Sequence, residues 1–257
     1  MTRRALTALI ATILVALAVT SIAAGQPAER DATWPELALE AAPADTQALS
    51  NRICRWLTAR RFQVGDCPQV YVSDDLPRMV AREECPDNPV VRQCRAAQSV
   101  AAIATRSGTV MAPDWADLTF GIQTPSADAI LTHTHELLHR VQAARAAGVM
   151  ANGRERIALW DWTPDDHYWE EALAEAVAQD LLPGIHRSLY PRFEVPRRPP
   201  YVAYGPSVRH LRALTARATR SPWRSRRARS MRAWLLRSDI TTRRAAIAAL
   251  TERSNTR

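Results

Sequence analysis

Two histidines and a glutamate stand at a spacing that suits metal-dependent hydrolysis. The pentapeptide from His135 to His139 reads H-E-L-L-H. Residues four apart on a helix share one face, with Cβ atoms roughly 5–6 Å apart, so both imidazoles can reach one metal ion. Glu136 lies on the flank of that face, where it can take a proton from a water activated by the metal. The motif therefore predicts a metal site with His135 and His139 as ligands and Glu136 as general base.

The surrounding residues predict the helix that this spacing requires. Ser126 is suited to the N-cap position and Asp128 to the first turn. His133 lies about 200° around the helix from His135, so we expect it to be packed or solvated and not a ligand. Apolar residues recur at helical spacing up to about position 147, before a glycine: Ala127, Ile130, Leu131, Leu138 and Val141.

A third metal ligand is expected from the next helical segment, because a catalytic zinc site needs three protein ligands and an open position for water. Residues 167–180 are rich in Ala, Leu and Glu, and they predict a helix that starts near Pro164 and ends at Pro183. Glu171 and Glu175 are four apart and share a face. One can bind the metal, while the other accepts the spare N–H of a ligating histidine and holds its ring.

Residues 105–182 resemble the gluzincin zinc metallopeptidases, the family that includes thermolysin. In that family the third ligand is a glutamate on the helix after the H-E-x-x-H motif, often within W-x-x-E-G-x-A-E. The stretch from Trp169 to Glu175 matches this pattern loosely, with Ala172 in place of the glycine. The resemblance implies a zincin-like fold and a Zn²⁺ ion held by the two motif histidines and Glu171, with Glu175 supporting a ligand.

Two features of this resemblance stay open or fail. Glu170 is an alternative third ligand, because Trp169 lies one residue closer to the glutamates than in the family pattern. A metzincin site is excluded, because Gln142 and Arg145 stand where that motif needs glycine and histidine. Similar enzymes also use a Tyr or His to stabilise the oxyanion. The candidates here are Tyr190, Tyr201, Tyr204, His210 and His167.

The amino terminus predicts export. Two arginines precede an apolar run over residues 5–24, and small residues follow at cleavage-site spacing. Residues 1–25 are therefore predicted to be a signal peptide of a secreted or periplasmic protein, with an uncleaved membrane anchor over 5–24 as the alternative. Export also favours disulfides between the four cysteines. Sequential pairing is the favoured one of three connectivities: Cys54 with Cys67, and Cys85 with Cys94.

The rest of the chain is predicted to be α+β, with a small N-terminal sheet and a mostly helical C-terminal part. Residues 26–48 are expected to be a linker, and 49–185 a zincin-like catalytic domain. Within it we expect a helix over 49–62, a strand over 69–72, a polar loop over 77–94, and a strand or helix over 99–105. A strand is expected over 108–113. Zincin-type peptidases, which the chain resembles, bind the substrate backbone along an edge strand before the motif helix, and residues 109–112 are the candidate for it; a plain core strand is the alternative.

Residues 186–257 are strongly basic, with 18 arginines against 3 acidic residues. Such a region can bind an anionic polymer or an anionic membrane surface. It also carries helical apolar stripes, which predict packing on the catalytic domain: Val208, Leu211 and Leu214, then Trp234, Leu235, Ile247 and Leu250. The sequence thus predicts an exported zinc metallopeptidase acting on a peptide or protein substrate. The alternative is an anion-binding protein whose zinc site is structural or vestigial.

Overall fold

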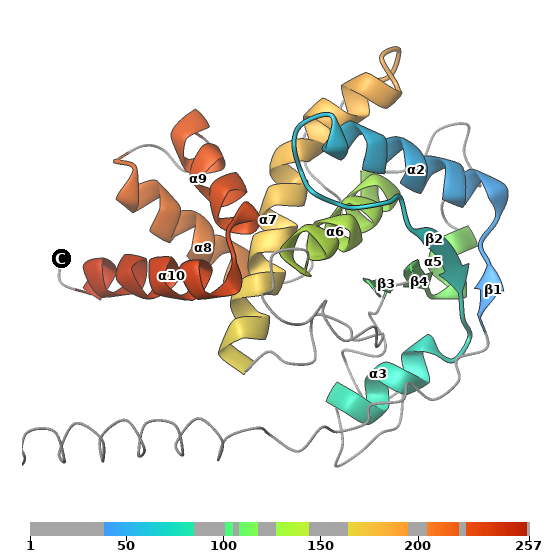
Figure 1. The fold of residues 1–257 in the computed structure, drawn as a ribbon, viewed down its shortest axis with the longest axis horizontal. Coiled ribbons are helices and arrows are strands. Elements are labelled where there is room, and N and C mark those ends of the chain that lie inside the picture. The colour runs from blue at the N-terminus through green and yellow to red at the C-terminus, as the bar shows by residue number, and fades with distance from the viewer. Residues whose placement is uncertain are drawn as a thin grey trace, which may run out of the picture. The chain divides into compact units, whose positions relative to one another are not determined.

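The computed structural model describes residues 39–84, 101–104, 108–117, 127–143, 164–194, 205–220 and 225–255. All of these lie in one compact unit that spans Leu37–Arg257. The unit is α+β, mostly helical with a small four-stranded sheet, as the sequence predicted (Figure 1). The predicted signal peptide, and the alternative anchor over residues 5–24, lie outside the described residues. Among the described helices, none is both long and apolar enough to cross a membrane.

The sheet is built from short strands in the order β1-β2-β4-β3. β2 (Gln69–Val72) has the predicted bounds, and it pairs antiparallel with β1 (Glu40–Ala41) and parallel with β4 (Gly108–Met111). β3 (Ala102–Ala104) pairs antiparallel with the other side of β4. Of the two alternatives for residues 109–112, the edge strand is therefore wrong and the core strand is confirmed: β4 is paired on both sides and all four of its residues are buried.

The first helix after β1, α2 (Ala44–Thr58), begins earlier than predicted. The segment 26–48 was expected to be a linker throughout, yet β1 and the first turn of α2 lie within it. Pro43 precedes the helix and Asp45 lies in the first turn, where a negative charge is favourable. The helix buries one apolar face: Leu49, Ile53, Trp56 and Leu57.

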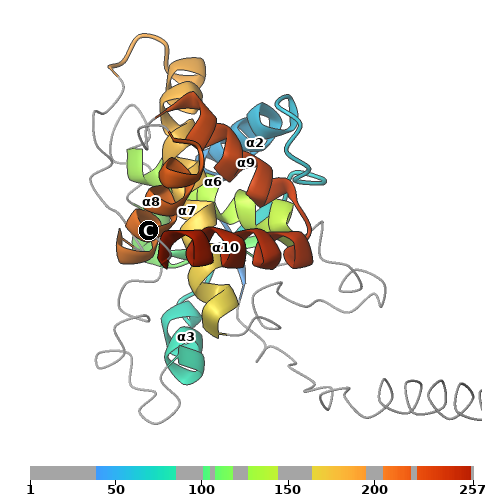
Figure 2. The same cartoon turned by 90° about the vertical axis from the view of Figure 1, so that its left-hand side faces the viewer.

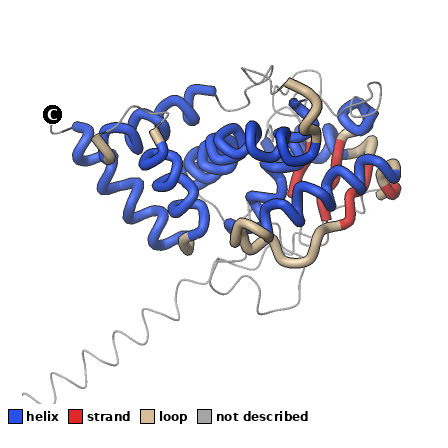
Figure 3. The backbone as a smooth tube through the Cα atoms, turned by 90° about the horizontal axis from the view of Figure 1, so that it is seen from above, coloured by secondary structure: helices blue, strands red, loops and turns tan. Residues whose placement is uncertain are grey.

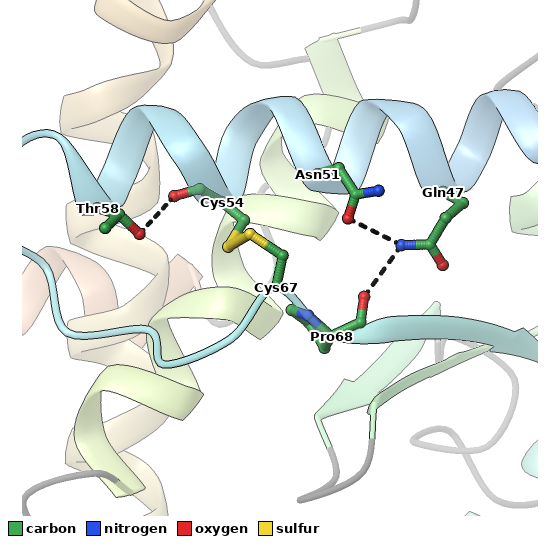
Figure 4. The surroundings of a disulfide bond; sticks show 6 residues. All are labelled: Gln47, Asn51, Cys54, Thr58, Cys67 and Pro68. Carbon is green, nitrogen blue, oxygen red and sulfur yellow. Dashed lines mark hydrogen bonds between the residues drawn. A yellow bond between two sulfur atoms is a disulfide. The ribbon is translucent and has the colours of Figure 1, made fainter.

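A disulfide between Cys54 and Cys67 joins α2 to the segment that enters β2 (Figure 4). This is one of the two predicted pairs; the other cysteines, Cys85 and Cys94, lie outside the described residues. Gln47 strengthens the same junction. Its side-chain amide donates to Asn51 Oδ1 and to the carbonyl of Pro68, at 3.0 and 3.1 Å, and accepts from the Val70 amide at 2.7 Å. Helix and sheet are thus held together by covalent and polar contacts.

Removing this disulfide should destabilise the fold. We expect the Cys54→Ala, Cys67→Ala double variant to lose about 3 kcal/mol of unfolding free energy, because a bridge over a short loop restricts the unfolded chain. Urea unfolding of the variant and of the wild type, followed by far-UV circular dichroism, measures the difference. Equal midpoints and slopes would show that the bridge contributes nothing to stability.

The first part of the predicted polar loop over 77–94 is helical, and residues 85–94 lie outside the described residues. Residues 76–84 form α3 (Leu76–Glu84), and a short helix α5 (Pro113–Asp117) follows β4. Leu76, Met79 and Ala81 of α3 are buried. These three side chains form the buried face of a largely polar segment. Packing of this face stabilises a helix that the composition of the segment favours only weakly.

Two long helices, α6 (Ala127–Ala143) and α7 (Pro164–Leu189), pack side by side in the middle of the unit (Figure 1). The five predicted apolar positions of α6 are buried. α7 continues past Pro183, which was expected to end it. At Gly184 an added Cβ would lie 3.1 Å from the Trp56 ring, so this glycine lets α2 approach closely. Burial of Ile185 and His186 in the next turn supports the continued helix despite the proline.

After the end of α7, the described residues of the arginine-rich region form three helices, α8 (Gly205–Ala218), α9 (Arg226–Arg237) and α10 (Ile240–Asn255). α8 and α9 pack on α7, and α10 packs on both of them (Figure 2). Figure 3 shows the helices next to the C-terminus and the strands on different sides of the unit. Most of the predicted apolar stripes are buried: Val208, Leu211, Leu214, Leu235 and Ile247. Trp234 differs, with half of its surface exposed. Binding of an anionic polymer or membrane through the exposed arginines stays a prediction.

Candidate metal centre

The packing of α6 against α7 brings the predicted ligands together. His135, His139 and Glu171 are all buried, and one ligand atom from each lies within 4.8 Å of the others. The ring nitrogens His135 Nε2 and His139 Nε2 are 2.9 Å apart. The Glu171 carboxylate lies 3.1 Å from the first and 3.4 Å from the second. Three donors from two helices therefore meet around one small volume.

These separations fit a small divalent cation. Zinc takes histidine nitrogens at about 2.0–2.1 Å and carboxylate oxygens at about 2.0–2.2 Å, so ligands of a tetrahedral site lie roughly 3.3 Å apart. The three measured separations, 2.9, 3.1 and 3.4 Å, bracket that value. With three protein donors, a four-coordinate ion keeps one position for another molecule. The group could therefore hold a metal ion of the kind that activates water.

The other nitrogen of each ring has a hydrogen-bond acceptor. Nδ1 of His135 donates to Glu175 Oε2 at 3.1 Å, because a carboxylate can only accept. Nδ1 of His139 lies 2.8 Å from Gln142 Oε1, and the amide nitrogen of Gln142 donates to the carbonyl of Glu170 at 3.0 Å. The Gln142 amide is thus oriented so that its oxygen faces His139. A proton held on each Nδ1 by these oxygens would leave both Nε2 lone pairs facing the site when a metal ion is bound.

Glu170 lies outside the group of donors. Its side chain accepts a hydrogen bond from Arg243 Nε of α10 at 2.6 Å, and both residues are buried. Successive residues of a helix point about 100° apart, so Glu170 and Glu171 face different neighbours. The structure therefore places Glu171, and not Glu170, next to the two histidines. Glu175 lies one turn further on and is held in turn by Gln179 Nε2 at 2.6 Å.

Glu136 is buried beside the same group and faces the sheet. The backbone N–H of Ala104, the last residue of β3, donates to its carboxylate. Burial raises the pKa of Glu136 above its ordinary value, while the charges of His135 and His139 act in the opposite direction. A raised pKa makes a carboxylate a stronger base. The structure thus brings the predicted general base and the predicted ligands into one buried cluster.

The electrostatics of the cluster favour positive charge between the rings. Burial acts to lower the pKa of His135, but its contacts with Glu171 and Glu175 raise that pKa well above the ordinary value. The pKa of His139 is also raised, against burial, mainly by the Glu171 charge. Burial acts to raise the pKa of Glu171, but the histidines hold it well below its usual range. The carboxylates that stabilise protons on these rings would equally stabilise a cation there.

The remaining predicted residues take different places. His133 is buried on α6 and burial lowers its pKa to about 4, so it is a packed neutral residue as expected. Of the oxyanion candidates, Tyr190 lies past the end of α7 under the Arg52 guanidinium. His210 lies on α8, where its ring lies tilted against the Trp169 ring, with 4.9 Å between the ring centroids. Tyr201 and Tyr204 lie outside the described residues, and the side chain of His167 is not described.

Gln142 is the functional candidate that sequence reasoning missed. It was considered only as the residue that excludes a metzincin site. Its position three residues after His139 on the same helix was the available signal, because residues at that spacing are neighbours on a helix surface. A side chain there can contact the outer nitrogen of the ring, as Gln142 does.

Replacing Gln142 should weaken metal binding. We expect Gln142→Leu to lower metal affinity roughly 10–100-fold, the usual effect of losing the partner of a metal-binding histidine. Competition with a coloured zinc chelator measures the change. Gln47→Leu is the matched control, since it removes an amide that bridges α2 and β2 away from this cluster. Equal zinc affinity in Gln142→Leu and Gln47→Leu would contradict the role of Gln142.

Comparisons with protein-family models, with curated proteins and with solved structures find no match for this chain.

Proposed function

We propose that this protein is a zinc-dependent metallopeptidase, with His135, His139 and Glu171 as metal ligands and Glu136 as general base. The observation that carries the proposal is the placement of the two rings: each Nδ1 lies within hydrogen-bond distance of a side-chain oxygen, and the two Nε2 atoms lie 2.9 Å apart beside the Glu171 carboxylate. A buried base one residue after the first histidine completes a set of groups suited to hydrolysis. A merely structural site would not require that base.

The donor set supports zinc as the metal. Two imidazoles and one carboxylate form a ligand set used by catalytic zinc sites, whereas magnesium and calcium prefer oxygen ligands alone. All the donors are buried, so the surrounding protein excludes most bulk water from the site. A zinc ion bound there would act as a Lewis acid on a carbonyl oxygen and would lower the pKa of a water molecule.

The side chains of this chain would carry the proton transfers. Glu136 takes the proton from the attacking water, and the N–H of Ala104 holds its carboxylate in place. Once protonated, Glu136 gives the proton to the leaving amine nitrogen, so that one carboxylate acts as base and then as acid. Glu175 and Gln142 keep the two rings oriented throughout.

Metal analysis combined with a hydrolysis assay tests the proposal. We expect the purified full chain to contain one zinc per molecule and to cleave a generic protein substrate such as casein. Treatment with 1,10-phenanthroline should abolish cleavage, and added zinc should restore it. A protein that binds zinc but cleaves neither casein nor a mixed peptide library would contradict the peptidase proposal and leave the metal site intact.

A further inference from the structure

We propose that Arg243, from the arginine-rich C-terminal region, is a positioning residue of the metal centre. The inference rests on the proposed metal site and extends it to α10. In this proposal part of the arginine-rich region belongs to the centre and holds its ligands in place.

A continuous chain of hydrogen bonds connects Arg243 to a metal ligand. Arg243 Nε donates to the Glu170 carboxylate at 2.6 Å, and Arg243 also donates to the carbonyl of Ser238. The carbonyl of the same Glu170 accepts from Gln142, whose oxygen accepts from Nδ1 of His139. Glu170 thus accepts one hydrogen bond from α10 at its side chain and one from α6 at its backbone carbonyl. A shift of Glu170 would move both Gln142 and the adjacent ligand Glu171.

Because both residues of this ion pair are buried, loss of either one should disturb the connection. Arg243 is 1% exposed and Glu170 is 3% exposed, so neither charge can be solvated if the other is lost. Loss of Arg243 would therefore favour a movement of Glu170 toward water or toward another donor. Because Glu170 precedes Glu171 in the same helical turn, that movement displaces the carboxylate between the two histidines.

A matched control lies on α9, which also contributes a buried arginine to α7. Arg232 of α9 is also fully buried, and its Nε and terminal nitrogen donate to Asp180 of α7 at 2.9 and 2.6 Å. Asp180 lies nine residues after Glu171, so it points to the opposite side of α7. Within the described part of the chain, the polar contacts of this pair lead away from the two histidines: Arg232 also donates to Thr215 of α8, and Asp180 also pairs with Arg212 of α8. Loss of either arginine removes a buried ion pair of α7, but only Arg243 is connected to a ligand.

The experiment compares metal binding by Arg243→Met and Arg232→Met in the full chain. Zinc affinity is measured by chelator competition under conditions where circular dichroism shows both variants folded. We expect Arg243→Met to bind zinc roughly 10–100-fold more weakly than wild type, as for the loss of other groups that support a ligand. Arg232→Met should stay near wild type. Arg243→Lys, which keeps the charge, should recover part of the affinity.

The visible absorption spectrum of the cobalt-substituted protein provides a measurement that general destabilisation does not change. The visible absorption of bound Co²⁺ depends on the arrangement of its ligands, so Arg243→Met should alter the spectrum and Arg232→Met should not. If Arg243→Met does not fold, the Glu170→Met, Arg243→Met double variant replaces it, because removing both charges of a buried pair is often tolerated. We expect this double variant also to show weakened zinc binding.

Three results are distinguishable. Wild-type protein without metal affinity would overturn the proposed metal site itself. Wild-type protein that binds zinc, with equal affinities and equal cobalt spectra in Arg243→Met and Arg232→Met, would overturn the role of Arg243 alone. Zinc binding at wild-type affinity in the double variant would overturn it as well.

Discussion

Glu136→Gln is expected to abolish peptide hydrolysis and to leave the metal bound. Glutamine cannot take the proton from the attacking water, and the loss of a general base costs roughly 10²–10⁴-fold in rate. The substitution keeps the shape of the side chain and an oxygen that can accept the Ala104 N–H. The zinc content, measured by atomic emission, should equal that of the wild type, because Glu136 is not among the grouped donors.

A second carboxylate of the same helix provides the control for Glu136→Gln. Asp128 lies in the first turn of α6, away from the motif, and Asp128→Asn neutralises it in the same way. This control should keep wild-type hydrolysis and metal content. A Glu136→Gln protein that retains most of its activity would rule out the proposed general base. Loss of both activity and zinc would instead mean that Glu136 is needed to build the site.

Glu171→Gln is expected to lose the metal. The amide carries no charge and is a weaker zinc ligand, so the affinity should fall by more than the roughly 10–100-fold that follows loss of a ligand's supporting partner. The two histidines would also lose the carboxylate that lies 3.1 and 3.4 Å from their Nε2 atoms. Hydrolysis should disappear together with the bound zinc, and excess zinc should restore it only in part.

Glu170→Gln is the neighbouring variant that separates ligand from non-ligand. Its side-chain oxygen can still accept the hydrogen bond from Arg243, and its backbone carbonyl still accepts from Gln142. We expect zinc affinity to fall by less than about tenfold, below the range for the loss of a ligand's partner. Chelator competition on both variants decides the comparison. Equal zinc content in wild type and Glu171→Gln would show that Glu171 is not a ligand.

The sequence predicted the local elements well where a periodic pattern agreed with packing. The bounds of β2 match, and the apolar face of α6 is buried at the predicted positions. It failed where tertiary contacts outweighed local signals. Pro183 reads as a helix end, yet α7 continues because Gly184 admits the Trp56 ring and the next turn is buried. α3 forms in a polar segment because three of its residues are covered by neighbours.

The order of strands could not follow from the sequence. β2 and β4 are parallel, and β3 pairs with the other side of β4. β3, the strand nearest the site, therefore lies at the edge of the sheet, although it precedes β4 in the chain. An alternating or apolar run of residues can predict a strand, but it does not indicate which strands lie beside it. The expectation of an edge strand at 109–112 was therefore wrong, and the Ala104 N–H that holds Glu136 belongs to β3.

The sequence by itself determined which side chains could meet within one helix. The four-residue spacing of His135 and His139 places both imidazoles on one face, and Glu136 beside them, whatever surrounds the helix. Only the tertiary structure decided between Glu170 and Glu171, because that choice depends on the rotation of α7 against α6 and on the burial of Arg243 beside Glu170. Contacts between helices depend on packing and buried charge across the whole unit, and no local spacing records them.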